Sequence, residues 1–485
     1  MEQKRHGSTV GAFVWSFLEQ GGVKVINLAV QIVLARLLDP NAFGVLAILV
    51  VVINVADAIA ESGMGSALVQ RSDVNADSYT TAFWLSEAVA LAMYLVIFLA
   101  APTISSFYKM PELVMYLRVM GVVLLTNSAN SIQRSYLQKG MDFKSLFRTN
   151  TFAALSSGLV GVVAALAGLG VWALVLQTMS LSVFACLALV RVVPWRPTHA
   201  FRRDQARSLF SYGWAISANG IINVIYSGIS ELILGRTVSS TQLGYYSQGR
   251  KWPTAAISAG SNAIQNVMFP ALAERKNDLE NFRRTMRRAL VVGTYVMAPL
   301  SMCITAMGKP LVLLLLGEKW NACIPIFQVA CFSNFPMMLM LVNLRAYMAL
   351  GNSGLYFRIN IIKIAIGMVA VGGTAIATGD IYTVAYVTAI YSVLTVFCVD
   401  MVPAKRETGL GWCEQMKLVL PILALSTVSM AITVLVGSLF ANIVVVLLTQ
   451  ITCFSSVYLG VSSVLHLEGY VELRTILSGV IHKQN

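Results

Sequence analysis

The chain has 485 residues, of which 57% are apolar and only 12% are charged, and its formal net charge is +13. A soluble domain carries about 25% charged residues, so this composition excludes a soluble globular protein and indicates a surface that faces lipid. A mean hydropathy of +0.72 agrees with this interpretation. The seven cysteines are scattered without a CxxC pair or a Cys/His cluster. We interpret them as small apolar side chains and expect neither a metal nor a cofactor.

A helix needs about 20 apolar residues to cross the hydrocarbon of a bilayer. About fourteen segments of the sequence meet this requirement, so we predict an all-α polytopic membrane protein with about fourteen transmembrane helices. In chain order, the segments are roughly 12–35, 43–66, 79–101, 112–132, 148–169, 171–193, 209–234, 243–270, 289–308, 323–349, 356–378, 381–402, 416–438 and 442–465.

The basic residues between these segments gather on one side of the predicted membrane. If the N-terminus is cytoplasmic, most of the 35 Lys and Arg residues fall in cytoplasmic loops, and the opposite loops hold Arg36, Lys109, Arg236, Lys309 and Lys319. Cytoplasmic loops are enriched in Lys and Arg. We therefore predict a multi-pass membrane protein with both termini in the cytoplasm. This topology explains the net charge, and no nucleic-acid partner is expected.

An internal repeat links the first and seventh predicted helices. The stretch 33–44 resembles 233–244, because each ends an apolar helix with Arg and places Gly eight residues later. Polar residues form matching stripes on the two preceding helices: Gln20, Lys24, Asn27 and Gln31 on one, and Asn219, Asn223, Tyr226 and Ser230 on the other. A duplicated polar stripe predicts two halves that face a shared polar cavity, as in a transporter.

A second pair of similar stretches, 134–150 and 345–360, extends the repeat over six helices. Six is an even number, so both halves enter the membrane from the same side and the repeat is parallel. We predict an N-lobe at 1–193, a cytoplasmic linker at 194–208, and a C-lobe at 209–402. Two appended helices and a cytoplasmic tail follow at 403–485.

A basic segment at 271–288 is predicted to form a short amphipathic helix on the inner leaflet. Two interpretations remain open: an anchor for anionic lipids that also sets the topology, or a contact for the phosphates of a substrate. The tail from residue 466 onward also has the apolar spacing of an interfacial helix.

Several of these residues resemble a known family. The run Leu34-Ala35-Arg36-Leu37-Leu38-Asp39-Pro40, followed by Phe43-Gly44, resembles the first-loop signature of bacterial polysaccharide flippases. The stretches 243–250 and 269–272 resemble the two ends of their eighth helix. These flippases form the polysaccharide-transporter branch of the multidrug, oligosaccharidyl-lipid and polysaccharide exporter superfamily, and the colanic-acid and teichuronic-acid exporters look most similar.

The resemblance implies two six-helix lobes around a central cavity, in a protein of the bacterial cytoplasmic (inner) membrane. It implies a flippase that exports undecaprenyl-pyrophosphate-linked oligosaccharide from the inner to the outer leaflet by alternating access, for the biosynthesis of surface lipopolysaccharide or exopolysaccharide. The expected partners are this lipid-linked oligosaccharide, membrane lipids and polysaccharide polymerase or export proteins.

Ionisable residues inside a bilayer are costly and usually face a cavity or a partner. The functional hypothesis is a cationic cavity that holds the pyrophosphate, because guanidinium groups bind phosphate through two parallel hydrogen bonds. The alternative is ion pairing within the membrane, for example between Lys24 and Asp57 or Glu61. The substrate-binding candidates are Lys24, Arg250, Lys251, Arg118, Lys363, Gln20, Asn27, Asn219 and Asn223.

Further candidates concern gating and coupling. Arg36, Asp39 and Arg236 are predicted at an outer gate. Asp57, Glu61 and Glu231 are candidates for coupling to a cation, although Glu231 also fits a shallow residue that reaches water. Voltage offers a second driving force, because moving an anion outward from a negative interior is favourable by about 2.3 kcal/mol per charge per 100 mV.

Two other functions are alternatives to a flippase. A membrane glycan polymerase or glycosyltransferase needs an aqueous catalytic platform, but the longest predicted outer loop, 308–322, contains one acid, Glu318. We therefore do not expect an enzyme. A multidrug exporter of the same superfamily would favour an acidic lumen for cationic drugs, whereas the predicted lumen is basic.

Overall fold

The computed structural model describes residues 9–61, 63–71, 73–198 and 201–482, and these ranges form helices and connecting turns without a strand. The prediction of an all-α protein is confirmed. By its contacts the chain divides into two compact units, Met1–Gly244 and Tyr245–Asn485, and the division falls inside one long helix.

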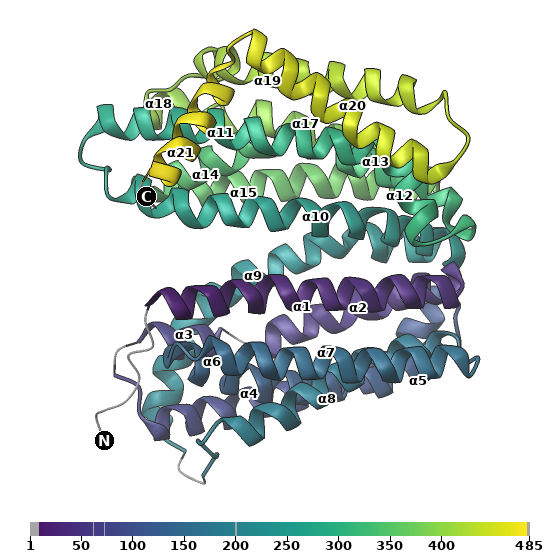
Figure 1. Ribbon diagram of the computed structural model, residues 1–485. Helices are drawn as coiled ribbons and strands as arrows, with labels where there is room; N and C mark the ends of the chain where they lie inside the picture. The colour runs from purple at the N-terminus through teal and green to yellow at the C-terminus, as the bar shows by residue number, and fades with distance from the viewer. Residues whose placement is uncertain (1–8, 62, 72, 199–200, 483–485) are drawn as a thin grey trace. The chain divides into compact units, whose positions relative to one another are not determined.

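Among its described residues, the first unit contains nine helices and the start of a tenth, and Figure 1 shows their arrangement. Helix α7 packs between α1 and α8, while α2 contacts α4, α6 and α9. The helices of this unit are α1 (Thr9–Leu37), α2 (Pro40–Glu61), α3 (Met64–Gln70), α4 (Ala76–Tyr108), α5 (Leu113–Met120), α6 (Val123–Lys139), α7 (Phe143–Leu166), α8 (Val171–Val192), α9 (Arg203–Thr237) and the beginning of α10 (Ser240–Ala273).

The second unit is organised around α11, which packs against α13, α14, α19 and α21. Its largest core cluster joins Phe282, Met286 and Leu290 of α11 to residues of α14 and α19. Its helices after α10 are α11 (Leu279–Ala306), α12 (Gly308–Leu315), η1 (Glu318–Cys323), α13 (Ile324–Phe332), α14 (Met337–Ala349), α15 (Ser353–Gly367), η2 (Met368–Gly372), α16 (Gly373–Thr378), α17 (Ile381–Thr395), η3 (Val396–Asp400), α18 (Ala404–Thr408), α19 (Trp412–Gly437), α20 (Ile443–Val464) and α21 (Glu468–His482).

Within the described residues, ten helices are long and apolar enough to cross a membrane, or eleven if the bent pair that ends with α14 is one span. Three other long helices, α1, α9 and α10, have 29, 35 and 34 residues and are not in this set. They carry the repeated junction and its flanking polar residues. A multi-pass membrane protein is therefore confirmed, while the count of fourteen stays a prediction.

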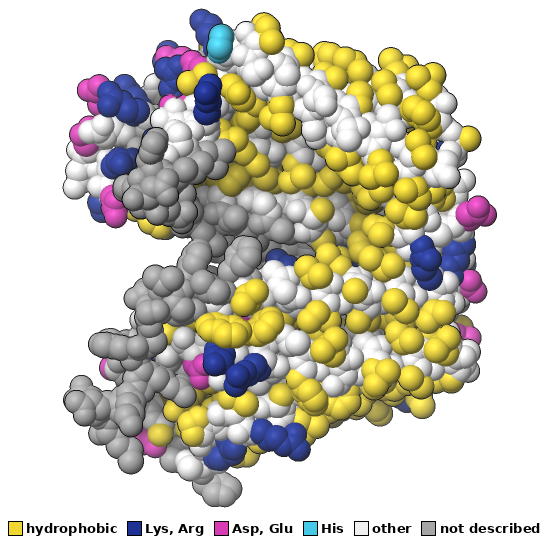
Figure 2. Space-filling view, in the orientation of Figure 1, with side chains coloured by type: hydrophobic (Ala, Val, Ile, Leu, Met, Phe, Trp, Pro, Cys, Tyr) yellow, Lys and Arg dark blue, Asp and Glu magenta, His cyan; other side chains and the backbone are white. Residues whose placement is uncertain are grey.

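Apolar side chains cover the outward faces of the C-terminal spans (Figure 2). Leu420, Val428 and Leu435 of α19 and Leu448 and Leu459 of α20 are all exposed. Such a surface is unfavourable in water but suits contact with lipid tails.

Two expected boundaries differ from the structure. The predicted span 323–349 is interrupted at Ser333–Pro336. The basic segment 271–288 forms no separate helix, because α10 continues to Ala273 and α11 begins at Leu279.

The repeated sequence produces the same local structure twice. Helix α1 ends at Leu37 and α2 begins at Pro40, just as α9 ends at Thr237 and α10 begins at Ser240. The two junctions touch each other through Gly44 and Gly244. A Cβ atom built on Gly44 would lie 1.7 Å from the carbonyl oxygen of Ser240, and one built on Gly244 would lie 1.9 Å from that of Pro40. The backbones can approach this closely only where both residues lack a side chain.

Replacing Gly44 or Gly244 by Ala is expected to force the two helices apart. Overpacking of a tight contact costs about 1–3 kcal/mol, so the thermal midpoint and the yield of monodisperse protein in detergent should both fall. Gly460→Ala on α20 is the matched control, because a Cβ there meets no atom within 4 Å. A Gly44→Ala variant as stable as the control would show that the close contact is absent in the membrane.

Candidate functional site

A hydrogen-bonded polar network joins three spans of the first unit. Asn127 of α6 donates through Nδ2 to Oδ2 of Asp57 on α2 at 3.0 Å. The Ser182 hydroxyl on α8 donates to Oδ1 of Asn127 at 2.5 Å and lies 2.6 Å from the Thr126 hydroxyl. Asn130 donates to the Ser182 carbonyl oxygen at 3.0 Å. The sequence-predicted Asp57 is thus held by neutral polar side chains of α6 and α8.

One turn along the same helices, the network contains charged groups. Ser131 and Glu61 are neighbours here, and the Arg134 guanidinium attracts both Glu61 and Glu19. Asn150 of α7 donates to Oε1 of Glu19 at 2.9 Å. The positive charge beside Glu61 is therefore that of Arg134 on α6, and polar groups of α1, α2, α6 and α7 gather at this level.

Buried carboxylate oxygens on α2 and α4 are incompletely satisfied. Asp57 Oδ1 and Glu87 Oε1 are buried, and neither has a hydrogen-bond partner among the described residues. Burying an ionised carboxylate without full pairing is costly. A proton or a bound cation at these oxygens would remove that cost, which keeps Asp57 a candidate for coupling.

In the second unit, Arg250 lines a polar pocket of about 180 Å³ between α10, α13 and α17. Its guanidinium group lies 5.4 Å from the ring centre of Tyr246 and donates to the hydroxyl of that residue at 3.4 Å. It is the one charged side chain among the residues that line the pocket, and the hydroxyl groups of Thr388 and Ser392 on α17 lie there with it.

This pocket opens onto a break in the membrane-spanning backbone. Ser333 and Asn334 line it and lie in the turn between α13 and α14, where the chain bends by 45° before Pro336. Irregular backbone is tolerated at membrane depth where it lines a cavity, because its polar groups are then not exposed to lipid. In transporters such broken helices frequently form binding sites.

Lys363 is placed in an ion pair. Its Nζ lies 2.9 Å from Oδ2 of Asp400, which is completely buried. The Tyr347 hydroxyl donates to the Asp400 carbonyl oxygen at 2.7 Å, and the Tyr391 hydroxyl donates to that of Lys363 at 2.6 Å. Asp400 ends the π-helical turn η3, a form often found at functional positions.

The remaining candidates are dispersed. Arg118 of α5 lies 4.3 Å from the ring centre of Phe98, and Arg236 lies 5.6 Å from that of Phe107. Arg36 and Asp39 are exposed beside the first junction, and Lys24, Asn223 and Lys251 are exposed on their helices, while Asn27 and Glu231 are half-buried. The side chains of Gln20 and Asn219 lie outside the described residues. The assignment of these residues to a substrate site or a gate stays a prediction.

Sequence reasoning missed the residues that complete these networks. Asn127, Asn130, Ser131 and Arg134 recur with helical spacing along α6, the first three inside the predicted span 112–132 and Arg134 just after it. This polar face was a signal in the sequence. Asp400 lies at the end of a predicted span, where an acidic residue usually reaches water. Only the contact with Lys363 distinguishes it.

The Lys363–Asp400 pair gives a stability prediction. Asp400→Leu or Lys363→Met alone leaves one buried charge and should cost about 3–5 kcal/mol, whereas the double variant should be nearly as stable as the wild type. The thermal midpoint in detergent measures all three. A double variant as unstable as the single variants would contradict a simple ion pair.

Comparison with known proteins agrees with this architecture. Residues 33–325 match the family model described as polysaccharide biosynthesis protein. An uncharacterized membrane protein in the cps region of Klebsiella pneumoniae is 25% identical over 74% of this chain and 74% of its own length. The succinoglycan biosynthesis transport protein ExoT of Rhizobium meliloti is 24% identical over 66% of this chain and 65% of its own. The lipopolysaccharide biosynthesis protein WzxC of Escherichia coli is 24% identical over 67% of this chain and 66% of its own length.

Solved transporter structures share the fold. The lipid II flippase MurJ in an inward closed conformation superposes with a TM-score of 0.74 at 12% identity, covering 94% of this chain and 99% of MurJ. An inward-facing multidrug resistance transporter of the MATE family superposes with a TM-score of 0.63 at 13% identity, covering 80% of this chain and 95% of that transporter. The chain is thus a membrane protein with a transporter fold, and it belongs to the family of polysaccharide biosynthesis proteins.

Proposed function

We propose that the protein is a flippase that moves an undecaprenyl-pyrophosphate-linked oligosaccharide from the inner to the outer leaflet by alternating access. Family membership, relatives named for polysaccharide biosynthesis and transport, and a fold shared with a lipid II flippase support this function. The export would supply cell-surface polysaccharide, and the protein would act as a transporter rather than an enzyme.

The observation that carries the proposal is the pocket of Arg250. It combines a single guanidinium group, several hydroxyl groups and a broken helix within one unit of a transporter fold. A guanidinium group can donate two parallel hydrogen bonds to phosphate oxygens, and the hydroxyl and amide groups can bind the remaining oxygens or a sugar. In this proposal Arg250 holds the pyrophosphate, and the oligosaccharide extends from it.

Coupling is assigned to the polar network around Asp57. Its second carboxylate oxygen lacks a hydrogen-bond partner among the described residues, so uptake and release of a proton or another cation would change the stability of the contact with α6. Voltage acts independently, because export moves the negative pyrophosphate out of a negative interior. The two driving forces can therefore be separated experimentally.

Arg250→Ala is expected to abolish surface polysaccharide while protein abundance stays near normal. Loss of charge-assisted hydrogen bonds worth about 1.5–3 kcal/mol each predicts a decrease in flipping rate of at least about tenfold. Arg250→Lys should restore only part of the activity, because an ammonium group cannot form the bidentate contact. Flipping of a fluorescent lipid-linked oligosaccharide in reconstituted vesicles provides the measurement.

Arg358→Ala is the matched control for Arg250, because it removes an arginine that is exposed on α15. Normal export by Arg250→Ala would exclude the pocket as the pyrophosphate site. The protein would be a drug exporter if all of these variants bound the lipid-linked oligosaccharide equally well but transported only a cationic drug.

Dissipating the membrane potential should slow flipping in vesicles even when no pH or sodium gradient is present. The expected effect of voltage is about 2.3 kcal/mol per charge per 100 mV. Asp57→Asn should remove the further stimulation by a cation gradient and leave the voltage-dependent part. A flipping rate that is unchanged without a membrane potential would refute voltage as a driving force. A full response of Asp57→Asn to the cation gradient would place coupling at another residue. Glu231→Gln is then the next variant to measure.

A further inference from the structure

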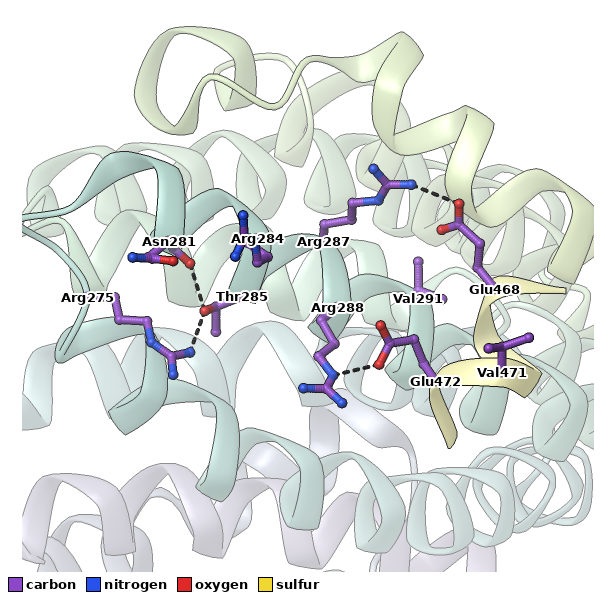
Figure 3. Close-up of a pocket in the computed structure, with 10 residues that line it drawn as sticks. All are labelled: Arg275, Asn281, Arg284, Thr285, Arg287, Arg288, Val291, Glu468, Val471 and Glu472. Atoms are coloured by element: carbon purple, nitrogen blue, oxygen red, sulfur yellow. Dashed lines mark hydrogen bonds and ion pairs between the residues drawn. The ribbon is translucent and has the colours of Figure 1, made fainter. Parts of the chain in front are cut away.

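A cleft with a volume of about 730 Å³ lies at the N-terminal end of α11 (Figure 3). Four arginines line it: Arg275 from the turn before α11, and Arg284, Arg287 and Arg288 from the first turns of that helix. We call it the arginine cleft. A neighbouring arginine, Arg283, does not line it and instead donates to the Thr408 carbonyl oxygen at 2.9 Å.

Two carboxylates from the C-terminal helix α21 enter the arginine cleft. The Arg287 guanidinium lies 2.8 Å from Oε1 of Glu468, and Nε of Arg288 lies 2.8 Å from Oε2 of Glu472. All four side chains are about half exposed. Exposed ion pairs of this kind contribute little to stability, between zero and about 1 kcal/mol each, so another anion can displace them at small cost.

Apolar contacts hold α21 independently of these ion pairs. Tyr470 and Leu473 pack against the buried cluster that contains Val291 and Tyr295 of α11. Gly469 lies against Tyr295 so closely that a Cβ there would be 2.6 Å from the Cβ of the tyrosine. The helix can therefore release its carboxylates from the arginines without leaving α11.

The charges of the arginine cleft do not balance. Its lining holds four arginines and two glutamates, which leaves a formal excess of two positive charges (4 − 2). Of the acids nearby, Glu280 lies 3.7 Å from Arg284 on the exposed side of α11. Asp278 caps the helix, and its hydrogen bonds from the Asn281 backbone and side chain hold its pKa below the usual value.

The position of the cleft defines the source of its ligand. The apolar part of α11 follows directly after Arg288, and α21 follows the membrane span α20. The arginine cleft thus lies where two spans leave the hydrocarbon, at the level of lipid headgroups. The anions at that level are lipid phosphates, and arginine binds phosphate through two hydrogen bonds in one plane.

We propose that the arginine cleft binds the phosphate of a membrane lipid, and that Glu468 and Glu472 take the place of that phosphate when no lipid is bound. Arg275, together with Arg284, whose pair with Glu280 is exposed to solvent, attracts the phosphate. Arg287 and Arg288 exchange their glutamates for its oxygens. Binding then leaves α21 attached only by its apolar contacts.

The test uses the full chain in nanodiscs of zwitterionic lipid, with phosphatidylglycerol or a short-chain polyprenyl pyrophosphate added. Native mass spectrometry measures lipid binding, and hydrogen exchange measures the opening of α21. Glu468→Gln with Glu472→Gln should tighten lipid binding about threefold or more, because it frees two arginines without removing any. Arg284→Gln with Arg288→Gln should weaken binding about tenfold. In the wild type, lipid addition should increase exchange at α21.

Arg406→Gln is the matched control, since it removes an exposed arginine of α18 that does not line the cleft. The opposite signs expected for the glutamate and arginine variants protect the test against misfolding, which could only weaken binding. Unchanged or weaker binding in the glutamate variant would overturn the proposal, as would equal losses in Arg406→Gln and in the arginine variant.

The two lipids distinguish the possible sources of the phosphate. Preference for phosphatidylglycerol would identify a site for a resident phospholipid, and preference for the polyprenyl pyrophosphate would identify a site where a transported lipid first binds. Both outcomes support a lipid phosphate. Binding of soluble pyrophosphate with no response to either lipid would contradict it.

Discussion

Hydrocarbon offers no hydrogen bonds, so each polar side chain within a span must find its partner inside the protein or in a cavity. In this molecule that requirement determines which helices are neighbours. Asp57 is bound by Asn127, Glu19 by Asn150, and Asp400 by Lys363, and each bond joins two different helices. Apolar contacts alone would allow these helices to slide or rotate against lipid of equal polarity. The polar bonds give each pair one register.

The same requirement explains where the backbone becomes irregular. The turn between α13 and α14 coincides with the pocket of Arg250, and the π-helical turn η3 ends at the buried Asp400. A regular helix would satisfy its own carbonyl and amide groups and present nothing to a ligand. A broken or widened turn frees such groups, and the polar residues beside it keep them from facing lipid. Local irregularity and buried charge therefore occur together.

Much of this architecture could be predicted from the residues in order. Long apolar segments gave the all-α membrane class, and the similarity of 33–44 to 233–244 anticipated two helix junctions with matching ends. The candidate site was harder to predict, because the periodicity of polar residues shows which face of a helix is polar but not which other helix packs against that face. Lys363 was recognisable as a costly charge, yet η2, α16 and α17 separate it from Asp400 along the chain. The interruption before Pro336 was hidden by apolar residues on both sides.

The contact between the two junctions is reciprocal: Gly44 meets Ser240, and Gly244 meets Pro40, which are the corresponding positions of the repeat. A contact in which each partner uses the same residues is isologous, the type found in symmetric dimers. A side chain added at either glycine therefore meets the backbone of the other junction. The two junctions thus meet inside one polypeptide as the equivalent surfaces of two subunits do in a symmetric dimer.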